Sequence, residues 1–466
     1  MGIFGLALSI AVFFVAGAAL GALLGLPLRM RLLTAYPLGV SAVTLQMFFY
    51  SLTGIPFGFF AISVPWFAVF VVVSAFKSTA RDNETPCKSQ GRLGAFEFFL
   101  IFVIVIQAVF SAANSVSLPV QGFDAWVIWF MKAKVFFADR TVGHDFFLNT
   151  VYSNGNPGTY TYPLTIPLAV AFSWTTMGYA DDQAVKFIFV LFYWCMLGSF
   201  YCFSREIISR KTALILTAML ATVPRVMEQG GLTGVGYADL PLAVYFLCAA
   251  GFGLAYMRSR TRRDYLLAVL FLTFGANVKN EGLTFLLAAF ALISGYAVFK
   301  DKKIGARGVF YGLLLCAVVV LPWLAFKAAL PRLSESLVSD FSAAAVFSNL
   351  DRLPFIVKTI VPKLFTANKY HISWALYAVG TLVSYRSLRK NGEYAFVQAL
   401  LWIQFSFYIL VYLVTPLELK SNIDTSFDRL TIQLLPLVYL SIAFGWRAFF
   451  NASGAGRDGL APETER

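Results

Sequence analysis

Charged residues are scarce in this chain, and their scarcity defines its class. Asp, Glu, Lys and Arg make up 13% of the 466 residues, whereas hydrophobic residues make up 59%. A soluble domain carries about 25% charged residues, so a soluble protein is excluded. Separate apolar runs of roughly 17–22 residues predict membrane-spanning helices, because barrel strands alternate over about ten residues. We therefore expect an all-α polytopic membrane protein without a large soluble domain.

Cysteine and histidine are also scarce, with five and two residues. Four cysteines lie in apolar runs and Cys87 lies in a basic loop, with no CxxC pattern. We therefore expect neither a disulfide framework nor a thiolate metal site. His144 and His371 fall in expected outer loops and have no neighbouring ligands at metal spacing. Neither is predicted to be a metal ligand.

The net charge of +13 does not indicate nucleic-acid binding, because Lys and Arg gather in short loops between apolar runs. Basic loops mark the cytoplasmic side of a membrane protein and suit anionic lipid head groups. Successive clusters are separated by two apolar runs, so all of them can face the cytoplasm. The clusters are Arg29 and Arg31, the loop 77–92, Arg205 to Lys211, Arg258 to Arg263, Lys300 to Arg307, Arg386 to Lys390, and Arg447. This alternation predicts about 13 spans, with the N-terminus outside and the C-terminus inside.

The same alternation assigns the outer loops and the division of the chain. Outer segments are expected at 116–183, 225–241, 327–371 and 416–430, with 279–281 at the outer end of a hairpin. We interpret 160–179 as a helix at the membrane interface, because a further span there would reverse the later loops. The first apolar run has no basic segment before it, so it is interpreted as a retained span and not a signal peptide.

Three parts of the chain are expected on this topology. Residues 1–94 would form an N-terminal three-helix membrane extension, and 95–448 the main transmembrane module with its outer loops. The polar stretch 449–466 would be a disordered cytoplasmic tail. We find no internal repeat.

The first candidate site is Asp124, in the stretch "DAWVIWFMKAKVFF". Trp126 and Trp129 suit the level of the lipid head groups. A carboxylate here is either an N-cap of an interfacial helix or a general base at the membrane surface. Lys132 and Lys134 follow on the same short helix, where they either reach lipid phosphates or bind the phosphate of a lipid-linked substrate.

Further polar residues mark the outer ends of later helices. In "YTYPLTIPL", Tyr162 precedes two prolines that fix how a helix begins. Asp239 opens a span beside glycine-rich backbone and is either an N-cap or a ligand contact. Lys279, Asn280 and Glu281 occupy a tight hairpin, where ionisable groups either close the turn as an ion pair or serve function.

Arg429 begins the last span, after Asp424 and Asp428. Its guanidinium either pairs with one of these aspartates at the surface or binds a phosphate with two hydrogen bonds. The outer face therefore combines carboxylates with cations around aromatic interfacial helices. Such a surface suits a substrate with a lipid tail, a phosphate and a polar head.

The order of "DAWVIWFMKAKVFF", "YTYPLTIPL", "VKNEG" and "DRLTIQLLP" resembles the GT-C superfamily of membrane glycosyltransferases. The resemblance covers roughly 95–440. It is greatest to the bacterial branch related to protein O-mannosyltransferases, the aminoarabinose transferase and the rhizobial galacturonosyltransferases. It implies transfer of one sugar from a polyprenyl-phosphate donor, usually with inversion, at the periplasmic face of a bacterial inner membrane. The acceptor would be lipid-linked, a polysaccharide or a protein.

The resemblance also implies residue roles. Asp124 matches the essential acid of the first outer loop and would be the general base. No acid stands beside it here, unlike in many relatives, so a second acid would be Asp239, Asp145, Glu281 or Asp139. Cations for the donor phosphate would be Lys279 and Arg429, supplemented by Lys132 or Lys134. Substrate-lining positions would be Trp126, Trp129, Tyr162, Asn280 and His371.

The implied chemistry requires no cofactor, although some GT-C enzymes use a metal, and His144 with Asp145 leaves that option open. About three spans precede the first-loop acid, more than is common in the family. A ligase or polymerase using a diphosphate-linked glycan is the main alternative, because 327–371 carries several cations: Arg332, Arg352, Lys358, Lys363 and Lys369. A transporter is less favoured, because transporters usually have internal repeats and charges at the membrane midplane.

Overall fold

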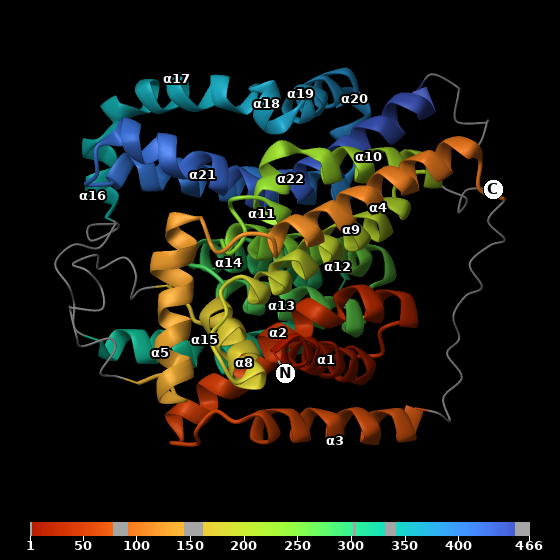
Figure 1. The fold of residues 1–466 in the computed structure, drawn as a ribbon. Helices are drawn as coiled ribbons and strands as arrows, with labels where there is room; N and C mark the ends of the chain where they lie inside the picture. Colours follow the sequence, from red (N-terminus) through yellow and green to blue (C-terminus); the bar gives the residue numbers. More distant parts are fainter. Residues whose placement is uncertain (1, 78–91, 144–161, 302–303, 331–341, 453–466) are drawn as a thin grey trace.

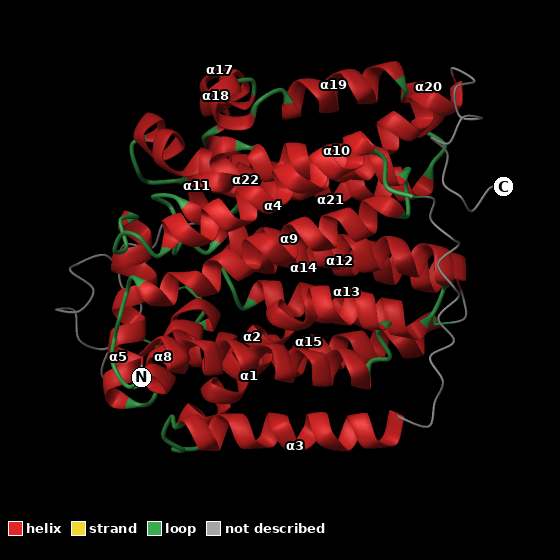
Figure 2. Ribbon diagram, turned by 45° about the vertical axis from the view of Figure 1, so that its right-hand side comes forward, coloured by secondary structure: helices red, strands yellow, loops and turns green. Residues whose placement is uncertain are grey.

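In the computed structural model, the described residues are 2–77, 92–143, 162–301, 304–330 and 342–452, and their regular structure is entirely helical (Figures 1 and 2). The first half of this chain contains α1 (Gly2–Leu23), α2 (Leu28–Leu52), α3 (Phe59–Lys77), α4 (Ala95–Ser115), the π-helix η1 (Ala125–Phe130), α5 (Met131–Asp139), α8 (Thr165–Met177), η3 (Ala184–Lys186), α9 (Phe187–Arg205), α10 (Arg210–Thr222) and α11 (Pro224–Gly231). The second half contains α12 (Asp239–Ser259), α13 (Arg262–Ala276), α14 (Asn280–Tyr296), η4 (Ala297–Asp301), α15 (Gly305–Ala329), α16 (Ala343–Ser348), η5 (Leu350–Arg352), α17 (Leu353–Leu364), α18 (Ala367–Tyr370), α19 (Ser373–Val383), α20 (Tyr385–Leu388), α21 (Gly392–Val414) and α22 (Leu419–Ala452). The expected all-α polytopic class is confirmed.

Within the described residues, nine helices are long and apolar enough to cross a membrane, so the predicted count of about 13 is not confirmed. The four other expected spans form α3, α10, α13 and α19. Three of these are short, with 13, 15 and 11 residues in α10, α13 and α19. At 1.5 Å per residue, such helices reach at most about 23 Å, less than the roughly 30 Å hydrocarbon core. These three runs are too short to span because charged residues bound them closely, as Lys211 and Arg225 do around α10.

The segments expected outside meet at one end of the bundle. Lys186 Nζ donates a hydrogen bond to the carbonyl of Pro119 at 3.2 Å, and this joins the start of α9 to the chain after α4. Arg352 donates to the carbonyl of Thr415 at 3.0 Å, and so 342–352 lies beside the end of α21. We call this the site end of the bundle.

The opposite end carries the basic loops, and we call it the basic end. Arg258 pairs with Glu393 at 2.5 Å, and Arg210 pairs with Glu97 at 2.7 Å, so each pair ties one helix to the end of another. The positions of the basic clusters in the sequence predicted two groups of loops, basic loops and outer loops. The structure places these two groups at opposite ends of the bundle. Which end faces the cytoplasm is taken up with the function.

The first two helices belong to the core of the bundle. A Cβ on Gly17 would lie 1.7 Å from the carbonyl oxygen of Ala35, and one on Gly39 would lie 1.7 Å from that of Phe13. Small residues at such crossings let membrane helices approach closely. Tyr36 then donates to the carbonyl of Ile188 in α9 at 2.7 Å. This part of the predicted 1–94 extension is thus packed into the main module.

Two shorter helices define the site end. The helix formed by η1 and α5 runs across the direction of the long helices (Figure 1), as expected for an interfacial segment. Helix α8 has 13 residues, too few to span, which agrees with its expected exclusion from the spans. It is nevertheless buried along most of its length and packs on α1, α2 and α5. It is therefore part of the core and not a surface helix.

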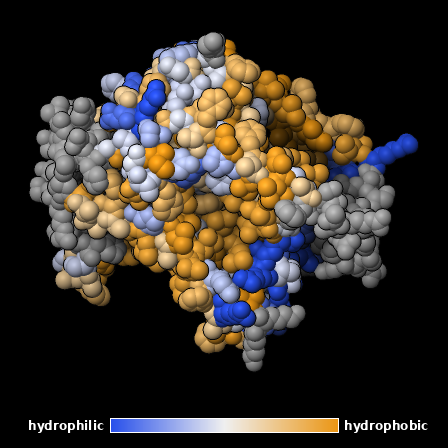
Figure 3. Space-filling model, turned by 90° about the horizontal axis from the view of Figure 1, so that it is seen from below, coloured by the Kyte–Doolittle hydropathy of each residue, from blue (hydrophilic) through white to orange (hydrophobic). Residues whose placement is uncertain are grey.

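The outer surface is suited to lipid. The side of the molecule below α3 in Figure 1 is mostly hydrophobic, with hydrophilic residues in separate groups (Figure 3). Exposed apolar side chains of α3 include Phe60, Val64 and Val71. Contiguous exposed apolar surface of this kind marks contact with a partner or a membrane. At the other end of the chain, α22 continues to Ala452, so 449–452 of the expected tail is helical, and 453–466 lies outside the described residues.

Candidate active site

Asp124 forms an ion pair with Arg429 of α22, which is 305 residues away in sequence. Both side chains are half-buried. Asp124 makes no capping hydrogen bond to the helix that it precedes, so the N-cap alternative is not what the structure shows. The residues that follow it form the π-helix η1, a rare conformation that is frequent at functional sites. The carboxylate is thus positioned by a distant guanidinium.

A second set of charges lies at the starts of α12 and α14. Lys279 Nζ lies 2.7 Å from Asp239 Oδ1 and 2.7 Å from Glu281 Oε1. Asp239 is only 1% exposed. Burial by itself lowers the pKa of Lys279, but the carboxylates of Asp239 and Glu281 outweigh it and hold that pKa above its usual range. The predicted Lys–Glu pair of the hairpin is therefore present and is extended by a buried aspartate.

Helix α22 connects the two sets. Gln433 lies one turn after Arg429 on this helix and donates a hydrogen bond to Asp239 Oδ1 at 2.6 Å. Tyr408 of α21 donates in turn to Gln433 at 2.6 Å. Asp239 and Glu281 also stand in the first turns of their helices, where the helix dipole favours negative charge. The five charged groups thus form one site, which we call the carboxylate cluster: Asp124, Asp239, Lys279, Glu281 and Arg429.

Two tyrosines pack around this cluster. The Arg429 guanidinium lies 5.3 Å from the ring centre of Tyr237, a cation–π distance. Burial raises the pKa of Tyr162 to about 12, so its hydroxyl stays neutral. The loop before α12 can approach η1 because Gly236 has φ +109°, and a Cβ there would lie 2.8 Å from that of Ala125. The glycine-rich backbone near Asp239 therefore serves close packing.

The carboxylate cluster carries one negative charge in excess, because three carboxylates face two cations. Glu281 Oε2 and Arg429 Nε are buried and have no hydrogen-bond partner in the described part of the chain. A buried polar atom without a partner costs about 1–3 kcal/mol. Such atoms at a cluster of mixed charge are available to the hydroxyl or amine groups of a substrate.

The short helix after Asp124 places its predicted residues differently. Trp129 is buried, with its ring centre 5.3 Å from that of Tyr162, whereas Trp126 is 59% exposed and lies outside the site. Lys132 is buried, and its Nζ lies 3.5 Å from the Tyr162 carbonyl oxygen. Lys134 is exposed. The structure thus separates the two lysines that the sequence treated as alternatives.

His371 and the aspartates before Arg429 belong to another group. Asp428 pairs with Lys369 at 2.6 Å and with Arg225 of α11 at 2.7 Å, and Asp424 pairs with Lys363 at 2.8 Å. The surface Arg–Asp pair considered for Arg429 is therefore not formed with either aspartate. His371 Nε2 lies 2.7 Å from the carbonyl oxygen of Thr222, so it contacts α10 and not the carboxylate cluster.

The remaining predicted positions are placed as follows. Asn280 is half-buried between the two charged residues of the hairpin. Asp139 is exposed at the end of α5, away from the carboxylate cluster. Asp145 and His144 lie outside the described residues. Within the described ranges, no group of three or more His, Cys, Asp or Glu could hold a metal ion.

Sequence reasoning missed several contributors. Tyr237, Gln433 and Lys327 were not selected, although Tyr237 packs on Arg429, Gln433 donates to Asp239, and the charge of Lys327 acts on Lys132. Gln433 follows Arg429 by four residues in an apolar helix, and a polar side chain at that spacing shares its face. Lys327 is a lysine in the last turn of an apolar span. Both polar residues are visible in the sequence, but a role can be assigned to either only when its contact on another helix is known.

Comparison with known families adds an independent finding. Residues 162–326 match the model of the dolichyl-phosphate-mannose-protein mannosyltransferase family. The resemblance to GT-C membrane glycosyltransferases is thereby confirmed for this segment, which contains Asp239, Lys279 and Glu281. Neither the curated proteins nor the solved structures give a significant match. The matched segment extends from Tyr162 to Phe326, near the end of α15.

Proposed function

We propose that this protein is a membrane glycosyltransferase that moves one sugar from a polyprenyl-phosphate donor to an acceptor. One observation carries the proposal. Carboxylates and cations from segments far apart in sequence form one cluster at the site end of a helical membrane bundle, and the family match includes three of them. A structural ion-pair network alone would not need an excess of carboxylate.

Asp124 is the general base of the proposed reaction. An acceptor hydroxyl or amine attacks the anomeric carbon of the donor sugar, and the Asp124 carboxylate takes the proton. The bond between that carbon and the phosphate oxygen breaks, and the lipid phosphate leaves with the electron pair. A base positioned in this way contributes about 10²–10⁴-fold to a rate. Arg429 orients the carboxylate, and no cofactor is needed to balance the step.

The remaining acids and cations have supporting roles. Asp239 is buried between Lys279 and Gln433, so it positions Lys279 and does not act as a second base. Glu281 keeps one carboxylate oxygen without a partner in the described residues and is the better candidate for contact with the sugar or acceptor. Positive charge near the leaving phosphate lowers the barrier as charge develops there. Lys279, Arg429 and Lys132 are the cations near enough to be considered.

The site end is proposed to face the periplasm of a bacterial inner membrane. The arginines and lysines of the basic end then lie in the cytoplasm, as the positive-inside rule requires. The N-terminal end of α1 supports the same topology, because Gly2 lies against the ring of Tyr179 near the start of α9. Membrane lipids would surround the bundle.

The structure gives less support to a ligase or polymerase. Two cations of 327–371 that favoured it, Lys363 and Lys369, are paired with Asp424 and Asp428. A third, Arg352, donates to the backbone carbonyls of Leu413 and Thr415. These contacts engage three of the cations that favoured this alternative, whereas Lys358 is exposed and Arg332 lies outside the described residues.

The direct test is a transfer assay in proteoliposomes supplied with polyprenyl-phosphate sugars. Asp124→Asn is expected to lower the rate at least 100-fold, because the amide cannot accept the proton. Asp351→Asn is the matched control, since Asp351 is an exposed carboxylate at the site end. Its rate should equal that of the wild type. An Asp124→Asn variant that keeps most of its activity would remove Asp124 as the base.

A further inference from the structure

The carboxylate of Asp428 lies one residue before Arg429 on α22 and belongs to a second buried polar group. Its Oδ2 lies 2.7 Å from Arg225 Nη2 and 2.6 Å from Lys369 Nζ. Its Oδ1 accepts a hydrogen bond from the Tyr370 hydroxyl at 3.0 Å. Asp428 is only 6% exposed. Three donors, from α11 and α18, therefore hold one buried side chain of α22.

Helix α11 contacts both helices that meet in the carboxylate cluster. Through Arg225 it binds α22 one residue before Arg429. Through Gln229 it accepts a hydrogen bond, at 2.9 Å, from the backbone N–H of Leu240, the residue after Asp239 at the start of α12. Because α22 and α12 also meet directly within the carboxylate cluster, the three helices form a closed ring of contacts.

Helix α11 is itself fixed to the rest of the bundle. The side-chain amide of Asn114 in α4 donates to the carbonyl of Gly231, the last residue of α11, at 2.6 Å. Gly231 also packs directly against the backbone of Ser111 in α4. The helix contacts α9 and α10 as well. A helix held in this way can keep Arg225 in place against α22.

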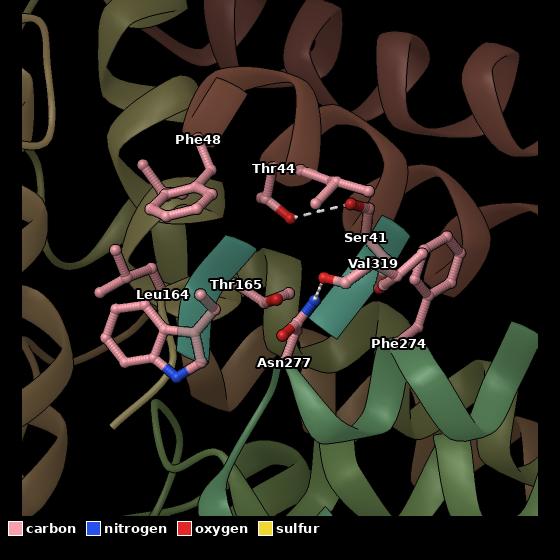
Figure 4. A pocket seen from close by; sticks show the side chains of 11 residues that line it. Ser41, Thr44, Phe48, Leu164, Thr165, Phe274, Asn277 and Val319 are labelled. Carbon is pink, nitrogen blue, oxygen red and sulfur yellow. Dashed lines mark hydrogen bonds between the residues drawn. The ribbon is translucent and has the colours of Figure 1, made fainter. Parts of the chain in front are cut away.

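The hairpin that carries Lys279 is positioned by different contacts. Asn277, two residues earlier, donates through its side-chain amide to the Val319 carbonyl of α15 at 2.8 Å (Figure 4). Its backbone carbonyl accepts a hydrogen bond from the Thr165 N–H of α8 at 3.3 Å. Because these contacts do not involve α22, a change at Asp428 is expected to leave the hairpin in place.

We propose that Asp428 is a positioning residue that, through its contacts with α11 and α18, sets the rotation of α22 at which Arg429 meets Asp124. This inference rests on the proposed transferase function, in which Arg429 orients the base. A helix rotation of about 10° moves a group roughly 6 Å from the axis by about 1 Å. A misplacement of about 1 Å can lower a rate about 100-fold. Asp428 thus acts through Arg429 and is not itself a catalytic residue.

Steady-state transfer by the full-length protein in proteoliposomes tests this role, with the polyprenyl-phosphate sugar that serves the wild type as donor. Asp428→Asn should lower kcat about tenfold or more, because Arg429 no longer holds the base in place. The KM for the donor should stay within about twofold of the wild-type value. A loss confined to KM would contradict the proposed role.

Asp424→Asn is the matched control for this measurement. Asp424 lies one turn before Asp428 on α22, is exposed, and pairs with Lys363 of α17 at 2.8 Å. Its kcat should equal that of the wild type. Arg225→Gln leaves Asp428 paired with Lys369, so it is the milder variant to use if Asp428→Asn does not fold. It should lower kcat in the same direction.

A double-variant cycle distinguishes positioning from a general loss of structure. Arg429→Gln removes the group through which Asp428 acts, so adding Asp428→Asn or Arg225→Gln to it should lower kcat no further. If the two losses multiply instead, Asp428 does not act through Arg429 and the inference is wrong.

The structure of Asp428→Asn, or of Arg225→Gln, by cryo-electron microscopy provides a test that does not depend on activity. Arg429 should be displaced from Asp124, while Lys279 keeps its ion pair with Asp239. An unchanged contact between Arg429 and Asp124 would overturn the inference and leave the proposed function standing. If the wild type transfers no sugar, the proposed function fails, and the position of Arg429 in the variant still decides whether Asp428 positions it.

Discussion

The two ends of the bundle use ion pairs in different ways. At the basic end, Arg258 pairs with Glu393 and Arg210 pairs with Glu97, and each pair joins the ends of neighbouring helices. At the site end, Lys279 is shared by Asp239 and Glu281, and Arg429 holds Asp124. The pairs at the basic end are partly exposed and join neighbouring helices. The carboxylate cluster buries three carboxylates with only two cations. Burying unbalanced charge costs free energy of folding, and such a cost is expected at a functional site.

The largest effect on stability is expected from Lys279→Gln. It would leave Asp239, 1% exposed, without its ammonium partner. Breaking a buried pair by removing one partner costs about 3–5 kcal/mol. The free energy of unfolding in detergent, measured against denaturant, tests this.

The double variant Asp239→Asn/Lys279→Gln sharpens the same comparison. Because it removes both charges, it should recover a substantial part of the loss. If the free energy of unfolding of Lys279→Gln lies within about 1 kcal/mol of the wild-type value, ion pairs at the site end contribute no more to stability than those at the basic end.

An intermediate effect is expected in the pH dependence of phosphate-lipid binding. Burial, with the charge of Lys327, lowers the pKa of Lys132 to about 7, and a bound anion favours its charged form. Affinity should therefore be fully present below pH 7 and fall as the pH rises above it, by at most about tenfold per pH unit. Lys327 is the charged group of the described chain that, after burial, contributes to the lowered pKa of Lys132.

The control for this prediction is Lys132→Arg, whose guanidinium stays charged over the whole range. The ratio of wild-type to Lys132→Arg affinity cancels the ionisation of the phosphate itself. That ratio should decline above pH 7. A ratio that stays constant from pH 6 to pH 9 would show that Lys132 does not titrate on binding.

The smallest effect is expected at the basic end. Arg258→Gln removes one member of a partly exposed pair. Pairs of this kind contribute roughly 0–1 kcal/mol. The same unfolding measurement should therefore give a loss of no more than about 1 kcal/mol, and a loss above 3 kcal/mol would erase the difference between the two ends.

Much of the fold was readable from the sequence, because its signals are local. The scarcity of charge gave the class, and the alternation of basic loops separated the two ends. The Lys279–Glu281 hairpin was also visible, since both residues stand in one short turn. The number of spans was not confirmed, because charged residues bound the apolar runs of α10, α13 and α19 too closely for a spanning helix.

Most charged residues of the candidate site were predicted from the sequence, but the contacts between them were not. Asp124 and Arg429 were each selected, but their pairing across 305 residues depends on how α22 packs against η1. Lys132 and Lys134 were likewise selected together, and burial distinguishes them only after the helix is placed. Local patterns give residue types at helix ends, and packing decides which of them meet.

The most direct test of the account is mass spectrometry of the lipids that copurify with the wild type and with Asp124→Asn. The account predicts a polyprenyl monophosphate or its sugar ester, retained most by Asp124→Asn, because that variant binds the donor but cannot complete transfer. Recovery of a diphosphate-linked glycan would contradict it in favour of a ligase or polymerase. Recovery of bulk phospholipid alone would contradict it in favour of transport.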